Sequence, residues 1–160
     1  MTEAIIPPRE ALVQWEREEP LFHALEMDAA IHMVYASDEV RSAMFDGPVR
    51  RFGISRGKFG VLLVLYHRRK ALAPSDLARL TGMTRASISK MLIQLKAEAL
   101  IQETIANEDG RQRRVELTEE GRQEIRKMLP LHYQRVYRLM SRLSDEEKRT
   151  LIDILKKLNP

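Results

Sequence analysis

Residues 85–98 carry the side chains of this sequence that are best suited to contacting the edges of DNA bases. If the stretch is a helix with one apolar stripe turned inward, its other face presents Arg85, Ala86, Ser89, Lys90, Ile93 and Gln94. Small residues let a helix sink into a groove, Ser and Gln can bond base edges or phosphate, and Arg or Lys can reach O6 and N7 of guanine. We therefore predict DNA contacts from all of these positions except Ile93. The alternative is a solvated amphipathic helix without a partner.

A second group of cations follows at the tip of an expected hairpin. Arg111, Arg113 and Arg114 lie at the end of a polar segment, Asn107-Glu108-Asp109-Gly110, that separates two extended runs. An arginine on such a protrusion can enter the minor groove, where narrow A·T-rich segments concentrate negative potential. The predicted DNA-binding residues therefore include Arg111, Arg113 and Asp109, which is expected to hold Arg111 extended through a charge-assisted bond. The alternative is a hairpin that its charge keeps soluble.

Two consecutive helices are needed to present the predicted DNA-contacting side chains of residues 85–98. A short helix is predicted over residues 75–81, and Gly82 after it is expected to take the positive φ that only glycine adopts cheaply. Thr84 then caps the longer helix. Ala78, Gly82 and Ile88 form a pattern of a small residue, a glycine and an apolar residue at the spacing that is typical of two closely crossing helices. This is the helix-turn-helix plan, which places its second helix in the major groove of DNA.

The rest of the sequence predicts a mainly α fold with a small β wing. Helical spacing, capping residues and short extended runs predict the other elements. The further helices are expected at residues 9–19, 21–45, 56–69 and 119 to about 142, and the strands at 101–106 and 113–117. Asp46-Gly47-Pro48 is expected to interrupt the second of these helices, and Pro130 to kink the fourth. Ser144 and Glu147 form a capping box that opens a last helix.

Composition limits the classes of protein to which the chain can belong. It has 160 residues, enough for one domain or two small ones, and no cysteine, which excludes disulfides and thiolate zinc sites. Its four histidines share no metal-ligand spacing, and the common phosphate-loop, nucleophile-elbow and zinc-protease motifs are absent. We therefore predict no metal, no cofactor and no enzymatic activity. Because no apolar run could span a bilayer and residues 1–17 lack a secretory leader, a cytoplasmic protein is expected.

The positive charge of the chain is concentrated on the segment with the helix-turn-helix pattern. Residues 50–114 hold fourteen Lys or Arg against five Asp or Glu, whereas residues 1–49 hold three against ten. A basic surface on one module is the electrostatic footprint of phosphate binding. Charge alone would leave a solvated basic face equally plausible. Its coincidence with the helix-turn-helix pattern favours a nucleic-acid partner.

Three motifs together carry a resemblance to a known family. The pattern Asp-x-Arg-x-x-x-(aliphatic)-x-Leu-Thr-x-x-Gly is met in register by Asp109, Arg111, Val115, Leu117, Thr118 and Gly121. Leu100-Ile101 precedes it at the matching distance, and Leu143-Ser144-Asp145-Glu146-Glu147 leads into the final helix. With these motifs the chain resembles, from residue 21 to residue 158, the MarR family of winged helix-turn-helix transcriptional regulators. It departs from the family pattern at Ala73, where a Ser or Thr cap is usual.

The resemblance implies a sequence-specific DNA-binding regulator that acts as a homodimer on a pseudo-palindromic operator, and repression is the expected mode. It assigns residues 21–52 and 119–160 to a helical dimerisation region and residues 53–118 to the winged helix-turn-helix domain. Residues 1–20 form an acidic N-terminal extension. A winged helix that binds a protein instead of a DNA sequence is the alternative function, but it would need no basic residues on its groove-facing surface.

The resemblance also implies that a small-molecule effector could release the DNA from a cleft between the two regions. The identity of such an effector is open. Ordinary core packing is the leading explanation for each aromatic or histidine residue near the expected cleft. The candidate cleft residues are His32, Tyr35, Phe45, His67 and Tyr133.

Overall fold

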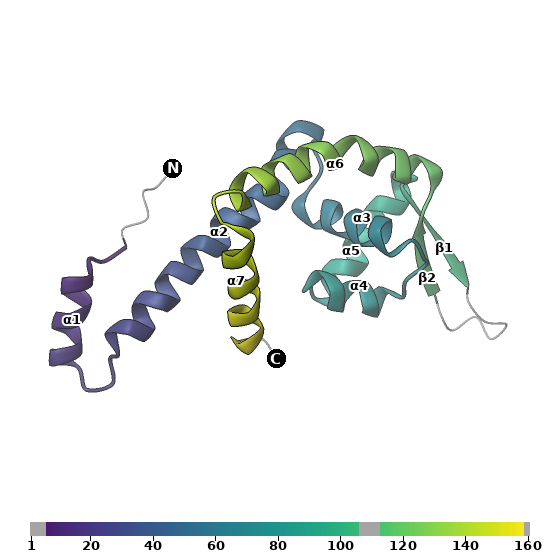
Figure 1. The fold of residues 1–160 in the computed structure, drawn as a ribbon. Helices are drawn as coiled ribbons and strands as arrows, with labels where there is room; N and C mark the ends of the chain where they lie inside the picture. Colours follow the sequence, from purple (N-terminus) through teal and green to yellow (C-terminus); the bar gives the residue numbers. More distant parts are fainter. Residues whose placement is uncertain (1–5, 106–112, 159–160) are drawn as a thin grey trace. The chain divides into compact units, whose positions relative to one another are not determined.

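The computed structural model describes residues 6–105 and 113–158 (Figure 1). Its elements are α1 (Arg9–Glu18), α2 (Ala24–Phe52), α3 (Arg56–Arg68), α4 (Pro74–Thr81), α5 (Arg85–Ala97), β1 (Ile101–Ile105), β2 (Arg113–Leu117), α6 (Glu119–Met140) and α7 (Asp145–Leu158). The prediction of a mainly α fold with a small β wing is confirmed. The chain separates into two compact units, Met1–Ser42 and Ala43–Pro160. No described helix is long and apolar enough to cross a membrane.

The first unit holds α1 and the N-terminal part of α2. Trp15, near the end of α1, meets Phe22 edge to face with 5.9 Å between ring centroids. The N–H of Ala24 donates to the Glu16 carboxylate at 3.1 Å, which satisfies one of the free N–H groups at the start of α2. These two contacts join the end of α1 to the beginning of α2.

The prediction that Asp46-Gly47-Pro48 interrupts the second helix is wrong, because α2 continues through this segment. A proline inside a helix leaves the carbonyl four residues earlier without its N–H donor. Here that carbonyl belongs to Met44, and the Nδ1–H of His132 on α6 donates to it at 2.7 Å. His132 is only 5% exposed, so the bond is shielded from water. A partner from a distant part of the sequence thus supplies the donor that the local sequence lacks.

The second unit is built around an apolar core to which α3, α4, α5, both strands and α6 contribute. Phe59 of α3 is completely buried and makes edge-to-face contacts with Phe45 of α2 at 6.2 Å and with His132 of α6 at 5.4 Å. Burying a side chain of this size contributes about 1.5–3 kcal/mol to stability. The C-terminal part of α2 therefore shares one core with α3 and α6.

The wing is a two-stranded antiparallel sheet in which Ile101 pairs with Leu117 and Glu103 pairs with Val115. A third segment reaches it at Leu72, whose N–H donates to the Val115 carbonyl at 2.9 Å. The Val115 N–H returns a bond to the Leu72 carbonyl at 2.8 Å. The two predicted strands are confirmed, whereas the bridge at Leu72 was not foreseen, since a single residue has no periodicity to read.

The hydroxyl of Thr118 connects the end of α5 to the start of α6. It accepts the Gly121 N–H at 2.9 Å, as an N-cap does, and donates to the Ala99 carbonyl at 2.6 Å. A Cβ on residue 121 would lie 1.9 Å from the carbonyl oxygen of Leu100, so only glycine fits there. The Leu-Thr-x-x-Gly part of the sequence pattern therefore has a steric cause.

Helix α7 begins with the predicted capping box. The Ser144 N–H donates to Glu147 Oε2 at 2.7 Å, and the Glu147 N–H donates to Ser144 Oγ at 3.2 Å. Hydrogen bonding of the Glu147 carboxylate to Ser144, first from its backbone N–H and then from its side chain, holds the pKa of Glu147 below its ordinary value. No residue of α7 is buried. Its apolar side chains, which are 36–61% exposed, are Leu151, Ile152, Ile154, Leu155 and Leu158.

Candidate nucleic-acid interface

The turn between α4 and α5 has the geometry that the sequence predicts. Gly82 has a φ of +69°, and an added Cβ there would meet no atom within 4 Å. The backbone conformation, and not a lack of space, is therefore what favours glycine. The Oγ1 of Thr84 accepts the Ser87 N–H at 3.2 Å and caps α5. The positive φ and the cap are both confirmed.

Helix α5 has one buried face and one exposed face. Ile88 and Leu95 are completely buried and Leu92 is 5% exposed, which confirms the inward stripe. The positions that the sequence assigns to the other face are exposed: Arg85, Ala86, Ser89, Lys90, Ile93 and Gln94. No residue of α5 is acidic. The core thus fixes the orientation of a helix whose outer surface is small, polar and cationic, although its contact with DNA stays a prediction.

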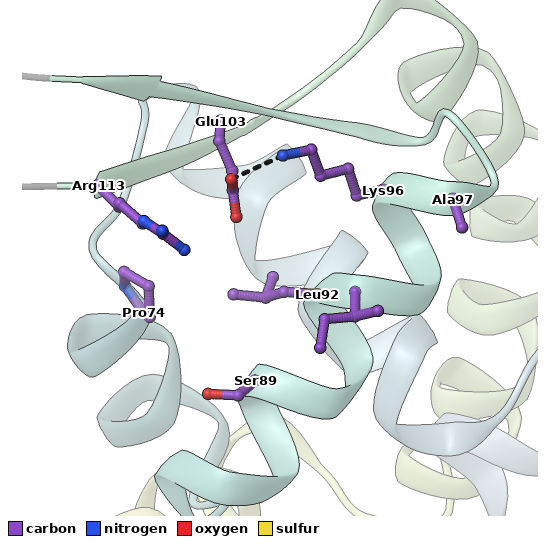
Figure 2. Close-up of a pocket in the computed structure, with 8 residues that line it drawn as sticks. Pro74, Ser89, Leu92, Lys96, Ala97, Glu103 and Arg113 are labelled. Carbon is purple, nitrogen blue, oxygen red and sulfur yellow. Dashed lines mark hydrogen bonds and ion pairs between the residues drawn. The ribbon is translucent and has the colours of Figure 1, made fainter.

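A groove of about 510 Å³ lies between α5 and the wing, and Figure 2 shows the side chains around it. Lys96 Nζ on α5 donates to Glu103 Oε2 on β1 at 2.8 Å. The hydrogen bond from Lys96 is the main reason why the pKa of Glu103 lies below its ordinary value, and the positive charge of Arg113 adds to it. Glu103 is therefore ionised at neutral pH. It holds the ammonium group of Lys96 at the edge of the groove.

Arg113 contributes the third charged side chain of the groove. In Figure 2 its side chain extends from β2 into the space between Glu103 and Pro74, the first residue of α4. Arg113 and Ser89 are the two predicted DNA-binding residues that line this groove. The sequence reasoning missed Lys96 and Glu103. A usable signal was present, because Lys96 lies three residues after Ile93 and therefore beside the predicted outer face.

Comparison with known proteins identifies a family whose members have a similar sequence. Residues 52–112 match the sequence model of the MarR family. The transcriptional repressor YetL of Bacillus subtilis is 33% identical over 104 residues, which cover 64% of this chain and 62% of YetL. By sequence the chain is similar to members of the MarR family. The predicted resemblance is thereby confirmed, and the chain spans 61–64% of the length of the curated relatives that it matches.

Solved structures, one of them named as a MarR family regulator, share the fold. Sco3205 of Streptomyces coelicolor, a MarR family regulator solved in complex with DNA, superposes with a TM-score of 0.77 at 22% identity, over 85% of this chain and 90% of Sco3205. BpsR of Bordetella bronchiseptica, whose DNA binding is regulated by 6-hydroxynicotinic acid, superposes with a TM-score of 0.67 at 22% identity, over 81% of this chain and 97% of BpsR. At this level of identity the likeness establishes the fold.

Two residues of the MarR-family wing pattern, Asp109 and Arg111, lie outside the described residues. Their predicted contact with each other and with DNA therefore stays a prediction. The strand register pairs Arg113 with Ile105 at the last described position of the hairpin. Arg113 is thus the residue of the predicted wing set that the structure places.

The predicted effector-cleft residues are divided between the two compact units. In the first unit, Nδ1–H of His32 faces both the carbonyl and the carboxylate of Asp28 at 2.9 Å. Tyr35 lines a shallow, mostly apolar depression together with Val34. These contacts give each residue a local role, and a cleft function stays a prediction.

The three cleft candidates of the second unit have different surroundings. Phe45 packs on the core through its contact with Phe59. The Tyr133 hydroxyl lies 3.3 Å from Nε2 of His67, which joins α6 to α3 through an exposed pair. Core packing therefore accounts for Phe45 but not for the His67 and Tyr133 pair. Among the described residues, no group of three or more His, Asp or Glu side chains could hold a metal ion.

Proposed function

We propose that this chain is a MarR-family, sequence-specific DNA-binding transcriptional regulator that acts as a repressor. The observation that carries the proposal is the exposed face of α5, where small side chains accompany Arg85 and Lys90 and no acidic residue intervenes. A capped helix of this kind, backed by a buried stripe, can enter the major groove with its first turn toward the base edges. YetL is named as a transcriptional repressor, and Sco3205 was solved with DNA.

The exposed residues of α5 divide the work of recognition. Arg85 at the start of the helix is proposed to bond O6 and N7 of guanine, while Ala86 beside it lets the helix approach the base edges. Ser89, Lys90 and Gln94 provide hydrogen-bonding groups to bases or phosphates along the following two turns. The wing residues Asp109, Arg111 and Arg113 extend the contact toward the neighbouring minor groove.

The regulator is proposed to act as a homodimer. Helix α7 buries none of its side chains and leaves its apolar face between 36 and 61% exposed. A second copy of the chain would remove this surface from water, which is the main driving force for association. Two recognition helices related by a two-fold axis must lie about one DNA turn apart, roughly 34–36 Å. In this proposal residues 21–52 and 119–160 form the dimerisation region, and residues 53–118 bind DNA.

A small-molecule effector is proposed to control DNA binding by changing the spacing of the two recognition helices. BpsR, which shares the fold, is a protein whose DNA binding is regulated by 6-hydroxynicotinic acid. A ligand weakens DNA binding only by as much as its affinity differs between the two conformations of the protein. A regulator works where the DNA is, so the proposal also places the chain in the cytoplasm and gives it no catalytic step.

Selection of bound sites from random duplexes tests the proposal directly. We expect an inverted repeat whose half-sites lie about one helical turn apart. Arg85→Ala should relax the preference at one or two base pairs of each half-site, by about 1–3 kcal/mol. Lys127→Ala, which removes an exposed cation of α6, is the matched control and should leave the selected site unchanged. Failure of the unaltered protein to enrich any duplex would overturn the proposal.

Salt dependence separates DNA binding from the alternative of a winged helix that binds a protein. Counterion release makes the logarithm of DNA affinity fall linearly with the logarithm of salt concentration, by about 0.9 per neutralised phosphate. Lys90→Ala should reduce this slope by about one phosphate contact per subunit. A flat dependence on salt would instead favour a protein partner.

A further inference from the structure

Ile93 is a large apolar side chain on the otherwise small and polar outer face of α5. It is 71% exposed, whereas Ile88 and Leu95 on the same helix are completely buried. The exposed side chain of Ile93 therefore contributes little to the core. It lies on the surface that the proposed function turns toward the major groove.

Lysines lie on both sides of Ile93. Each residue of an α-helix turns about 100°, so residues three positions before and after lie about 60° to either side and about 4.5 Å away along the axis. Lys90 and Lys96 occupy these two positions. The Nζ of Lys96 lies 2.8 Å from Oε2 of Glu103, which holds the lysine on its flank of Ile93, and the Lys96 side chain remains 57% exposed. Ile93 is thus centred between two cations.

The neighbours of Ile93 along its own stripe are small. Residues four and seven positions away share one side of a helix, and here they are Ala86, Ser89 and Ala97. All three are exposed. No bulky side chain on this stripe would therefore keep a surface away from Ile93.

We infer that Ile93 is a specificity-determining residue that contacts the C5 methyl group of a thymine in the major groove. In DNA, sugar-phosphate strands border the major groove on both sides. The cations on both flanks of α5 are placed to pair with the phosphates of these strands. This arrangement leaves the side chain of Ile93 over the base edges. Thymine is the base that presents a methyl group there, and an apolar side chain is its natural contact. The inference rests on the proposed function and adds a base preference to it.

The experiment uses the site obtained by selection and replaces its thymines one at a time by deoxyuridine, which pairs with adenine in the same way but lacks the C5 methyl. We expect one thymine in each half-site at which the replacement weakens binding of the unaltered protein about fourfold, the effect of exposing one methyl group. Ile93→Ala should bind the two duplexes equally. Ile93→Val, which keeps part of the side chain, should keep part of the difference.

Lys90→Ala is the matched control, because it removes a neighbouring contact without touching the methyl group. It should weaken binding to the thymine and deoxyuridine duplexes by the same factor. Equal melting temperatures would establish that Ile93→Ala is folded. If every deoxyuridine replacement changes the DNA affinity of the unaltered protein and of Ile93→Ala by the same factor, the inference is overturned, while the proposal of DNA binding stands. If the unaltered protein enriches no duplex, both the inference and the proposed function are overturned.

Discussion

Helices α5 and α7 are similar in length, with 13 and 14 residues, and both carry an apolar stripe, yet the two stripes have different surroundings. The inward residues of α5 are at most 5% exposed, with the exception of the half-buried Met91. Those of α7 are at least 36% exposed. An apolar stripe therefore indicates that a helix face needs cover, but does not say whether the same chain provides it. For α5 the chain does so, and for α7 we propose a second copy.

The largest effect is expected from opening the covered face of α5. Leu95→Ala should lower the free energy of unfolding by about 2–5 kcal/mol, because the cavity left behind cannot collapse fully. Denaturant unfolding measures this change. Ile93→Ala on the exposed face of the same helix is the control and should stay within about 0.5 kcal/mol of the unaltered protein. Equal effects of the two substitutions would contradict the two-faced description of α5.

Charging the uncovered face of α7 should act on assembly. Leu151 and Leu155 lie one turn apart, and replacing both by Glu should convert the proposed dimer into a monomer. Affinity for a two-half-site operator should then fall on the order of a hundredfold, because the two winged domains are no longer linked. Sedimentation velocity and operator titration measure the two effects. Lys157→Glu places the same charge on α7 beside the stripe and should leave the dimer intact. If the unaltered protein is a monomer, the proposal that a second copy covers the apolar stripe of α7 is wrong.

A smaller effect is expected at the turn that begins α5. Gly82→Ala should cost about 1–2 kcal/mol, since an L residue is disfavoured at the φ of +69° found there. No clash adds to this cost, because the new Cβ would meet open space. The melting temperature should therefore fall by a few degrees. An unchanged melting temperature would contradict the left-handed conformation of this residue.

The smallest effect concerns the capping box that begins α7. Because hydrogen bonds from Ser144 lower the folded-state pKa of Glu147, its contribution to stability is present above the ordinary value of 4.5 and is lost as the pH falls through the lower folded value. An NMR titration of the Glu147 carboxyl should therefore give a pKa below 4.5. Ser144→Ala removes the side-chain hydrogen bond but keeps the backbone N–H, which is the larger cause, so the pKa should rise only part of the way toward that value. A pKa that does not respond to this substitution would show that the Ser144 side chain does not contribute to the lowering.

The sequence predicted best those parts of the fold that depend on neighbouring residues. The caps at Thr84 and Ser144 were readable because a cap needs only a side-chain oxygen and an N–H two or three residues later. The exposed face of α5 was readable for the same reason, since one helical period determines it. These features required no knowledge of the tertiary structure.

Features that depend on distant partners escaped the prediction. The helix through Pro48 is completed by His132, which lies far along the sequence. The groove beside α5 depends on the pairing of Lys96 with Glu103, and that pairing needs the hairpin to fold back on the helix. Local patterns predicted a break in the first case and gave no warning of the second. The exposed residues that α5 contributes to the candidate site were therefore mostly predicted, whereas those that β1 and β2 contribute were predicted only in part.

Position 121 shows how a single oxygen atom can limit the evolution of a helix. Any amino acid other than glycine would bring a carbon into the space that the Leu100 carbonyl already fills. Glu119 and Glu120, two residues and one residue earlier, are exposed. Lineages that diverge from this chain can change the amino acids at those two positions, while residue 121 must stay glycine unless the backbone after α5 moves with it.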